Sequence, residues 1–393
     1  MGNKIRVGLV YGGRSGEHEV SLQTALAVLK AFDYSKYELI PFYITSTGQW
    51  RSGPLLSAPP AAVAELQFGK PGAGGEAAGG DAASGEAAGG DAANGGGNAL
   101  LPVLRGMSER VLTEGEPAGD GKPVDVMFPL LHGTFGEDGT IQGLFEMAGL
   151  PYVGAGVLAS SVGMDKVAMK MMFAQAGLPQ VDYRYFTRFG WKEDREARLN
   201  EVEELGYPCF VKPANLGSSV GVSKARNREE LTAAIETALR YDRKVIIEQF
   251  VDAREIEVSV LGNDQPRASV PGEIRSSNEF YDYKAKYTDG KSEMEIPANL
   301  PPETAEAVRR MAVRAFLAID GSGLCRADFF LRRDNGELLI NEVNTMPGFT
   351  PYSMYPLMWK ETGVSYQELL DTLIRLALER YEEKQSIDYG SEV

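Results

Sequence analysis

Residues 326–348 read R-A-D-F-F-L-R-R-D-N-G-E-L-L-I-N-E-V-N-T-M-P-G. Two apolar runs flank the tripeptide D-N-G at 334–336, and this arrangement predicts a β-hairpin. Because side chains alternate between the two faces of a strand, Arg326 and Asp328 are expected to point the same way. On the second strand, one face is expected to carry Leu338, Ile340, Glu342 and Asn344.

The polar ends of this hairpin predict a metal site. If the register brings them together, Asp328, Glu342 and Asn344 form a cluster of hard oxygen ligands, with the cation of Arg326 beside it. Such clusters suit Mg²⁺, whose coordination is completed by water and substrate phosphates. The alternative is a polar hairpin end with a surface salt bridge. The T-M-P-G that follows favours the metal site, because the backbone N–H groups of such a turn can bind an anion.

The pattern R-A-D-F followed by N-E-V-N-T-M-P-G resembles the metal-binding hairpin of the ATP-grasp ligases, and within them the D-alanine–D-alanine ligases. The resemblance implies an α/β fold, α+β in the ATP-grasp part, with a Rossmann-like N-terminal domain before it. Three domains are expected: an N-terminal substrate domain at 1–154, a central subdomain with a glycine-rich loop at 155–248, and a C-terminal subdomain with a closing loop and the metal hairpin at 249–393.

Length and composition agree with a multidomain globular protein. The chain has 393 residues, of which 43% are hydrophobic, and its net charge is −15. That charge, without a basic stripe, predicts no nucleic-acid partner. Cys209 and Cys325 lie in apolar runs and are expected to be buried thiols in a reducing compartment. The N-terminus leads straight into an expected strand and no apolar run is long enough to span a membrane, so a cytoplasmic protein is predicted.

The first expected strand, at residues 4–10, runs into the turn G-G-R-S-G-E-H-E-V-S and a helix that ends near residue 32. A glycine-rich turn at a helix N-terminus can bind an anion. The absence of G-x-G-x-x-G disfavours a dinucleotide site. The resemblance implies that Glu17 contacts the first D-alanine; the alternative is a glutamate that interacts favourably with the helix dipole.

The next expected strand, at residues 124–131, is followed by H-G-T-F-G-E-D-G-T. The carboxyl end of such a strand is where α/β proteins build their sites. The resemblance implies that His132 lies near the carboxylate of the first substrate; the alternative is a structural histidine. One helix is expected at residues 160–177. Its M-D-K matches the family, and the resemblance implies a contact between Lys166 and the nucleotide phosphates; the alternative is a solvated helix lysine.

An expected strand at 207–213 leads into K-P-A-N-L-G-S-S-V-G-V, a loop able to fold over phosphates. It is not a Walker A loop, because G-K-[ST] is missing. The resemblance places Lys212 on the nucleotide phosphates, Ser219 with the nucleotide, and Ser218 between the loop and the rest of the site. The alternative is a mobile surface hairpin.

Residues 245–251 form an apolar strand that turns polar at its end. The resemblance implies that this is the hinge that binds adenine, with Glu248 and the backbones of Gln249 and Val251 at the base and Glu255 at the ribose. Residues 255–261 alternate polar and apolar side chains, which predicts a half-buried antiparallel strand.

Residues 276–293 lack helical or strand periodicity but are rich in tyrosine and lysine. They resemble the loop that closes over the site in this family, with Lys286 reaching a phosphate and Tyr287 reaching Ser218 and Glu17. After the hairpin, the resemblance places Gly348 in the catalytic set. Further residues are implied to bind the carboxylate of the second substrate: Ser353 and Met354.

One segment departs from the family. Between about 68 and 98 the chain is almost wholly Gly, Ala, Ser, Asp and Glu, with G-E-A-A-G-G-D-A-A present twice. It has too few apolar side chains to offset its ordering entropy, so a disordered surface insertion is predicted. The last expected helix, at 366–383, carries an apolar stripe that predicts a packing role.

The resemblance implies that ATP phosphorylates one D-alanine and that a second D-alanine attacks the resulting acyl phosphate, for peptidoglycan precursor synthesis. It also implies two Mg²⁺ ions, replaceable by Mn²⁺, and a homodimer. The nearest rival is a D-alanine–D-lactate ligase, against which Tyr287 argues. More distant rivals are another ATP-grasp ligase, such as a biotin-dependent carboxylase, and a nucleotide-binding regulatory module without turnover. The intact set of lysines and metal ligands argues against the last of these.

Overall fold

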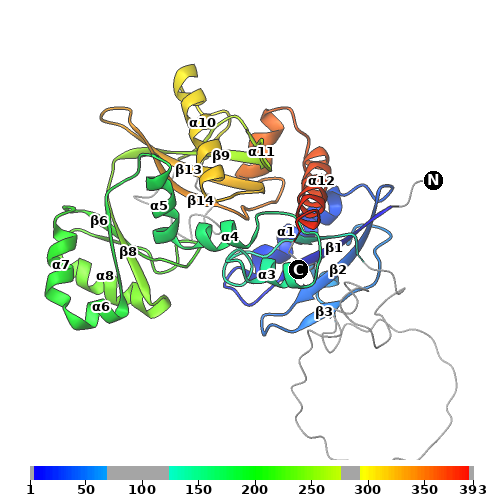
Figure 1. Cartoon of the computed structure of the whole chain (residues 1–393), viewed down its shortest axis with the longest axis horizontal. Helices are drawn as coiled ribbons and strands as arrows, with labels where there is room; N and C mark the ends of the chain where they lie inside the picture. The colour runs from blue at the N-terminus through cyan, green and yellow to red at the C-terminus, as the bar shows by residue number, and fades with distance from the viewer. Residues whose placement is uncertain (1–3, 69–123, 276–292, 389–393) are drawn as a thin grey trace, which may run out of the picture.

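The computed structural model describes residues 4–68, 124–275 and 293–388. These residues form three β-sheets, each with its own hydrophobic core. Figure 1 shows the N-terminal sheet (blue) and the central sheet (green) at opposite ends of the molecule, with the C-terminal sheet between them. The mixed α/β fold predicted from the sequence is confirmed. The predicted insertion and the predicted closing loop, with Lys286 and Tyr287, lie outside the described residues.

The N-terminal sheet has the strand order β3-β2-β1-β4, and β1 pairs in parallel with both β2 and β4. Every residue of β1 after Ile5 is buried, as expected for a parallel strand covered on both faces. Helices α1 and α3 belong to two different apolar clusters, one on each face. The elements of this part are β1 (Ile5–Gly12), α1 (His18–Ala31), β2 (Tyr37–Ile44), β3 (Trp50–Ser52), the short 3₁₀ helix η1 (Val63–Leu66), β4 (Val126–Pro129) and α3 (Thr140–Met147).

Gly12 ends β1 in a conformation that glycine adopts more readily than other residues. Its φ is +92°, and a Cβ at this position would lie 2.1 Å from the carbonyl oxygen of Ile44. The backbone N–H of Gly12 donates a hydrogen bond to Ser21 Oγ at 2.7 Å, and that hydroxyl donates to the Leu130 carbonyl. The turn before α1 is therefore fixed beside the loop that follows β4, which brings Glu17 to the carboxyl edge of the parallel strands.

The central sheet is antiparallel, with the order β5-β8-β6-β7. Three helices, α6 to α8, pack their apolar residues against one face. On the other face, Val167 packs with Ala214 and Ile246. The elements are β5 (Tyr183–Thr187), α6 (Arg188–Glu193), α7 (Arg195–Glu203), β6 (Cys209–Pro213), β7 (Ser223–Ala225), α8 (Arg228–Tyr241) and β8 (Lys244–Gln249).

The C-terminal sheet has the order β12-β11-β9-β13-β14, with β10 paired to β9. Helices α4, α5 and α10 pack on it in one apolar cluster. The predicted central subdomain, at 155–248, included α4 and α5, which here pack on the C-terminal sheet. The elements are α4 (Val157–Met164), α5 (Lys166–Gln175), β9 (Ala253–Gly262), β10 (Arg267–Ala268), β11 (Gly272–Arg275), β12 (Glu293–Glu295), α10 (Pro302–Ala318), β13 (Gly323–Arg332), β14 (Leu338–Asn344), α11 (Met354–Glu361) and α12 (Tyr366–Gln385).

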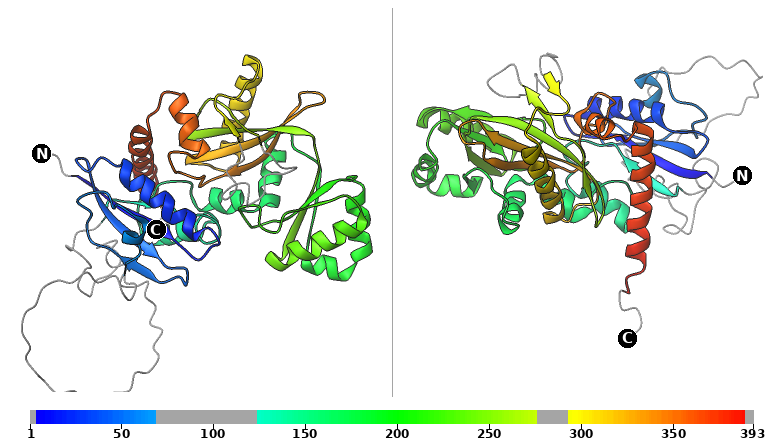
Figure 2. Two further views of the ribbon diagram at one scale, coloured as in Figure 1. Left: turned by 180° about the vertical axis from the view of Figure 1, so that it is seen from behind. Right: turned by 90° about the horizontal axis from the view of Figure 1, so that it is seen from above.

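The last helix joins the C-terminal part to the N-terminal sheet. Leu369, Leu373 and Leu376 of α12 are buried in the same cluster as β1 and α1. Figure 2 shows α12 (red) beside the N-terminal sheet in both views. The packing role predicted from the apolar stripe is therefore confirmed. Within the described ranges, no helix is long and apolar enough to cross a membrane.

The prediction of a single helix at residues 160–177 was wrong, because Asp165 interrupts it and separates α4 from α5. This residue has extended backbone angles, and its carboxylate accepts hydrogen bonds from the backbone N–H groups of Val167 and Ala168. It also forms an ion pair with Lys244. An aspartate that caps a helix satisfies donors that an uninterrupted helix would not leave exposed. Lys166 therefore begins α5 rather than lying in the middle of a longer helix.

Two expectations about strand faces were also wrong. A register shift falls between Asp328 and Phe329, so that Asp328 pairs with Glu342 and Phe329 pairs with Ile340. The extra residue of this bulge turns Ile340 into the core, away from the face that carries Glu342. On β9, the predicted polar face is not exposed, because Glu257 is 6% exposed and Ser259 is fully buried.

Candidate active site

Two cavities adjoin where the three sheets meet. The first encloses about 300 Å³ between the central and C-terminal sheets, and the second about 420 Å³ between the N-terminal loops and the turn after β14. Six residues line both cavities, so molecules bound in the two would meet there. These shared residues are Lys166, Gly217, Ser218, Glu257, Arg326 and Glu342.

The hairpin brings the predicted metal ligands to this junction. Asp328 lies opposite Glu342, and Arg326 lies opposite Asn344. The amide oxygen of Asn344 accepts a hydrogen bond from the backbone N–H of Met346 at 3.0 Å, which orients the side chain. An amide oxygen has two lone pairs, so a second one remains for a metal ion. Within the described ranges, no group of three or more His, Cys, Asp or Glu side chains is arranged to hold a metal ion. The predicted set differs from such a group because its third member is the Asn344 amide.

Arg326 occupies the centre of the acidic cluster. Its Nε and Nη2 donate to the two carboxylate oxygens of Asp328 at 2.7 and 2.6 Å. Its Nε also lies 3.0 Å from Oε2 of Glu257. The guanidinium thus binds, in a bidentate manner, the carboxylate predicted to bind a cation. This charge and oxygen chemistry fits Mg²⁺, which prefers carboxylate and amide oxygens.

Lys166 connects the hairpin to the glycine-rich loop. Its Nζ donates to the Leu216 carbonyl at 3.0 Å and lies 3.9 Å from Glu342 Oε2. In that loop, Ser218 and Ser219 have φ values of +53° and +57°, in the left-handed region that non-glycine residues seldom adopt. Strain of this kind persists only where surrounding contacts hold it, and here a hydrogen bond from the Ser218 hydroxyl to the Glu17 carboxylate does so. Two of the three segments predicted to meet, the glycine-rich loop and the turn before α1, are therefore in contact.

Glu248 lies between two lysines at the wall of the first cavity. Its carboxylate is 2.8 Å from Lys170 Nζ and 2.5 Å from Lys212 Nζ. Burial acts to raise the pKa of Glu248, but Lys170 and Lys212 together hold it well below its usual range. Lys212 was predicted at this site and Lys170 was missed. The sequence feature that could have identified Lys170 is its position four residues after Lys166, which places both lysines on one face of α5.

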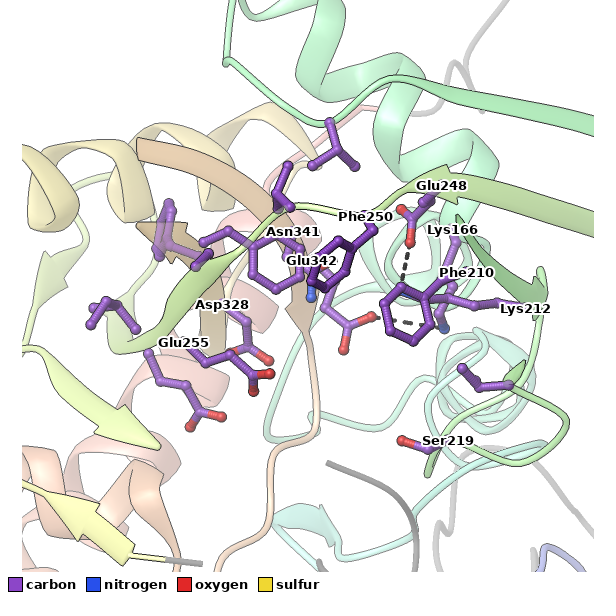
Figure 3. Close-up of a pocket in the computed structure, with 18 of the residues that line it drawn as sticks. Lys166, Phe210, Lys212, Ser219, Glu248, Phe250, Glu255, Asp328, Asn341 and Glu342 are labelled. Carbon is purple, nitrogen blue, oxygen red and sulfur yellow. Dashed lines mark ion pairs between the residues drawn. The ribbon is translucent and has the colours of Figure 1, made fainter. Parts of the chain in front are cut away.

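The other residues predicted for the nucleotide line the same cavity, whose walls include Phe210 and Phe250. Figure 3 shows these two rings close to Glu248 and Lys212, with Glu255 and Asp328 on the other side and the Glu342 carboxylate between them, directed toward Lys166. A slot with aromatic walls and a polar rim can take a flat base with an attached phosphate chain. The predicted nucleotide residues that the structure places here are Lys166, Lys212, Ser219, Glu248, Gln249, Val251 and Glu255.

His132 lines the second cavity and is 6% exposed. Its Nδ1 lies 3.2 Å from the Met346 carbonyl, which can only accept, so Nδ1 carries the proton. Its Nε2 is 3.3 Å from Thr24 Oγ1. Burial lowers the pKa of His132, against the opposing effect of Glu17. A neutral imidazole with both nitrogens bonded to protein suits a positioning role better than a direct charge on a substrate.

The turn after β14 builds the far wall of the second cavity. Ser353 precedes α11, and Gly348, Ser353 and Met354 all line the space. A Cβ at Gly348 would lie 3.1 Å from Ser353 Oγ, so a larger residue would crowd that hydroxyl. The Ser353 hydroxyl makes no capping bond to α11. Met354, the first residue of α11, lines the cavity, and a helix N-terminus can bind a carboxylate.

Glu137 is a second residue that the sequence interpretation missed, although it stands within H-G-T-F-G-E-D-G. Its Oε1 accepts the backbone N–H of Gly133 at 2.9 Å. A Cβ at Gly217 would lie 3.5 Å from both Glu137 Oε1 and Glu17 Oε2, so the two carboxyls flank one point of the loop. Burial and the negative charge of Glu17 raise the pKa of Glu137 to about 8.

This raised pKa predicts the effect of Glu137→Gln on stability. A carboxyl whose folded pKa exceeds its ordinary value binds more protons in the folded state, so wild-type stability falls as pH rises from about 4.5 to about 8. The amide does not titrate and keeps an acceptor for Gly133. The variant should therefore gain stability relative to wild type across this window, on the order of a few kcal/mol at pH 8. Melting temperatures at pH 5, 6, 7 and 8 measure this.

The exposed Glu193→Gln serves as the matched control, because Glu193 lies on the surface at the end of α6. Its melting temperature should stay parallel to that of wild type at every pH. A Glu137→Gln curve that is likewise parallel to wild type would show that Glu137 is an ordinary ionised carboxylate.

Comparison with known families assigns both halves of the chain. The family model described as D-ala D-ala ligase N-terminus matches residues 6–155, and the one described as D-ala D-ala ligase C-terminus matches residues 172–375. A D-alanine--D-alanine ligase of Bacillus licheniformis is 54% identical over 387 residues, which cover 98% of this chain and 99% of that protein.

Solved structures of similar ligases share this fold. The D-alanine-D-alanine ligase from Coxiella burnetii superposes with a TM-score of 0.76 at 30% identity, and the match covers 98% of this chain and 97% of that one. The VanG D-Ala:D-Ser ligase from Enterococcus faecalis gives a TM-score of 0.75 at 32% identity, covering 95% and 100%. With both family models matched and more than half of the residues identical to a full-length relative, the chain belongs to the D-alanine–D-alanine ligase family.

Proposed function

We propose that this protein joins two D-alanine molecules into D-alanyl-D-alanine, with ATP converted to ADP and phosphate. The observation that carries the proposal is the junction of two cavities at Lys166, Arg326 and Glu342. One cavity fits a base and its phosphates, and the other has polar groups suited to amino acids. Family membership supports the same pair of substrates. The relative from Bacillus licheniformis is named for this reaction.

The chemistry requires activation of a carboxylate. A carboxylate is a poor acyl donor because oxide is a poor leaving group, so an oxygen of the first D-alanine attacks the γ-phosphorus and ADP leaves. The amine of the second D-alanine then attacks the acyl carbon of D-alanyl phosphate and expels inorganic phosphate. Phosphoryl transfer of this kind depends mainly on positioning and on neutralising charge.

The described residues can supply both. Lys166 reaches the junction from α5 and Lys212 lines the first cavity from β6, so the two lysines can neutralise charge on the phosphates. Arg326 adds a third cation between the two cavities. Glu17 places a carboxylate, held by Ser218, where the ammonium group of the first D-alanine would bind. Each of these groups is held by another group of the protein: Lys166 by the Leu216 carbonyl, Lys212 by Glu248, Arg326 by Asp328, and Glu17 by Ser218.

Two Mg²⁺ ions, or Mn²⁺ in their place, would be held by Asp328, Glu342 and Asn344, and when bound they would neutralise charge on the phosphates. The second D-alanine would place its carboxylate at Ser353 and Met354, at the start of α11. His132 and Gly348 shape the wall between the two amino-acid positions. On the basis of the resemblance alone, Lys286 and Tyr287 would close over the site and exclude water from the acyl phosphate.

The proposal has a cellular part, which rests on family membership. The dipeptide would enter peptidoglycan precursor synthesis, and the enzyme would act in the cytoplasm as a homodimer.

The experiment is a coupled assay with the purified full chain, ATP and MgCl₂. Phosphate release should depend on D-alanine, and D-alanyl-D-alanine should accumulate in equal amount. Parallel reactions with D-alanine plus D-lactate or D-serine test the second substrate, the latter because one structural relative is a D-Ala:D-Ser ligase. A reaction with bicarbonate and biotin tests the carboxylase alternative. Phosphate release that ignores D-alanine, or no release in any reaction, would overturn the proposal.

A further inference from the structure

Glu248 and its two lysine partners differ in their access to the first cavity. The side chains of Lys170, Glu248 and Lys212 are 1%, 5% and 16% exposed. Glu248 and Lys212 line the cavity, whereas Lys170 does not. One carboxylate is therefore shared by a lysine that can reach a bound nucleotide and a lysine that lies behind the wall.

We propose that Lys170 is a positioning residue that holds the Glu248 carboxylate at the cavity wall while Lys212 turns to the phosphates of the bound nucleotide. This inference rests on the proposed function, because it requires that a nucleoside triphosphate occupies this cavity. It assigns a task to a buried lysine that makes no contact with substrate.

Two cations neutralise the buried carboxylate of Glu248, at 2.8 Å from Lys170 and 2.5 Å from Lys212. A triphosphate attracts Lys212 more strongly than one carboxylate does, because it carries several negative charges. After that move, the pair of Lys170 and Glu248 remains neutral as a whole. Without Lys170, the same move would leave a buried carboxylate without a partner, which is strongly unfavourable.

Among the described residues, the cations within ion-pair distance of Glu248 are Lys170 and Lys212. It lies opposite Tyr183 on β5 and opposite Phe210 on β6. The charged or titratable groups that influence it are Lys170 from α5, Lys212 from β6 and the Tyr183 phenol. The ring of Tyr183 also lies 5.6 Å from Lys170 Nζ, in cation–π geometry that helps to fix the lysine.

A buried carboxylate that loses its partners takes up a proton. Lys170→Met should therefore couple nucleotide binding to proton uptake, because Lys212 leaves Glu248 only when Glu248 is protonated. The probe is β,γ-imido-ATP with MgCl₂, titrated into the full chain by calorimetry at pH 7 in buffers of different ionisation enthalpy. Relative to wild type, we expect about one additional proton taken up per nucleotide. We also expect the Kd of the variant to rise by up to about tenfold from pH 7 to pH 8, beyond any change in wild type.

Lys170 is needed for nucleotide binding only because Glu248 is charged. The double variant Lys170→Met/Glu248→Gln should therefore lose the binding defect of Lys170→Met. With an amide at 248 there is no buried charge to neutralise. We expect the double variant and Glu248→Gln alone to bind the analogue with Kd values within twofold, and with no additional proton uptake. The exposed Lys192→Met should match wild type in every respect.

Proton uptake and a pH dependence equal to wild type in Lys170→Met would overturn the inference. If Lys170→Met does not fold, the pair Glu248→Gln and Lys170→Met/Glu248→Gln decides, since a tenfold difference in Kd between them would also overturn it. A wild-type protein that does not bind the analogue at all would instead contradict the proposed function.

Discussion

We expect Glu342→Gln to fold normally and to release phosphate at less than about a tenth of the wild-type rate. Glutamine keeps the size of the side chain and its place on β14, opposite Asp328. It removes one negative charge from the proposed ligand set and from the contact with Lys166, 3.9 Å away. A single electrostatic element of a phosphoryl-transfer site is typically worth a few kcal/mol. Activity against MgCl₂ concentration measures this, and the Mg²⁺ requirement should also shift upward.

A matched control lies on the same hairpin. Glu337 is exposed in the turn between β13 and β14, 3.6 Å from Arg332. Glu337→Gln should leave both turnover and Mg²⁺ dependence unchanged. Near-normal turnover of Glu342→Gln at all Mg²⁺ concentrations would remove Glu342 from the metal site.

Arg326→Met should affect both stability and activity. The guanidinium binds Asp328 in a bidentate manner and pairs with Glu257, and Asp328 and Glu257 are 13% and 8% exposed in their side chains. Removing one partner of a buried ionic cluster costs about 3 kcal/mol or more, because charge is left uncompensated. We expect a lower melting temperature and a loss of phosphate release of more than about a hundredfold.

Strand β13 provides an unusually close control for this substitution. Arg332 makes the same two-residue bidentate contact with Asp334, at 3.0 and 2.7 Å, but Asp334 is 62% exposed. An exposed pair contributes about 1 kcal/mol or less. Arg332→Met should therefore change stability little and activity not at all. Equal effects of the two substitutions would show that the Arg326 cluster has no special role in the site.

The sequence predicted most of the site because its motifs are local and each lies at an element boundary. The hairpin, the turn before α1, the loop after β4 and the glycine-rich loop were all identifiable from short patterns. The structure then brings Glu17 to Ser218 and Asp328 to Glu342. The contact between Asp328 and Glu342 lies within one hairpin and was predictable from its pattern, whereas the contact between Glu17 and Ser218 joins segments far apart in the chain and was predictable only through the family resemblance.

The errors have physical causes. The bulge between Asp328 and Phe329 shifts the register by one residue, and alternation alone gives no sign of it. To predict the interruption at Asp165, one has to distinguish an aspartate that caps a helix from one inside a helix. Here the capping aspartate also forms an ion pair with Lys244, a contact that the local sequence does not show. Lys170 and Glu137 were missed because burial, rather than residue type, makes them unusual. Burial depends on tertiary packing and leaves little trace in one sequence.

The formation of D-alanyl phosphate is tested most directly with D-alanine labelled with ¹⁸O in its carboxylate. Attack of that carboxylate on the γ-phosphorus, followed by expulsion of phosphate by the second amine, moves one labelled oxygen from D-alanine to phosphate. Mass spectrometry of the phosphate should therefore show one ¹⁸O for each dipeptide formed, with ADP as the other product. Unlabelled phosphate, or AMP that carries the label, would contradict the account.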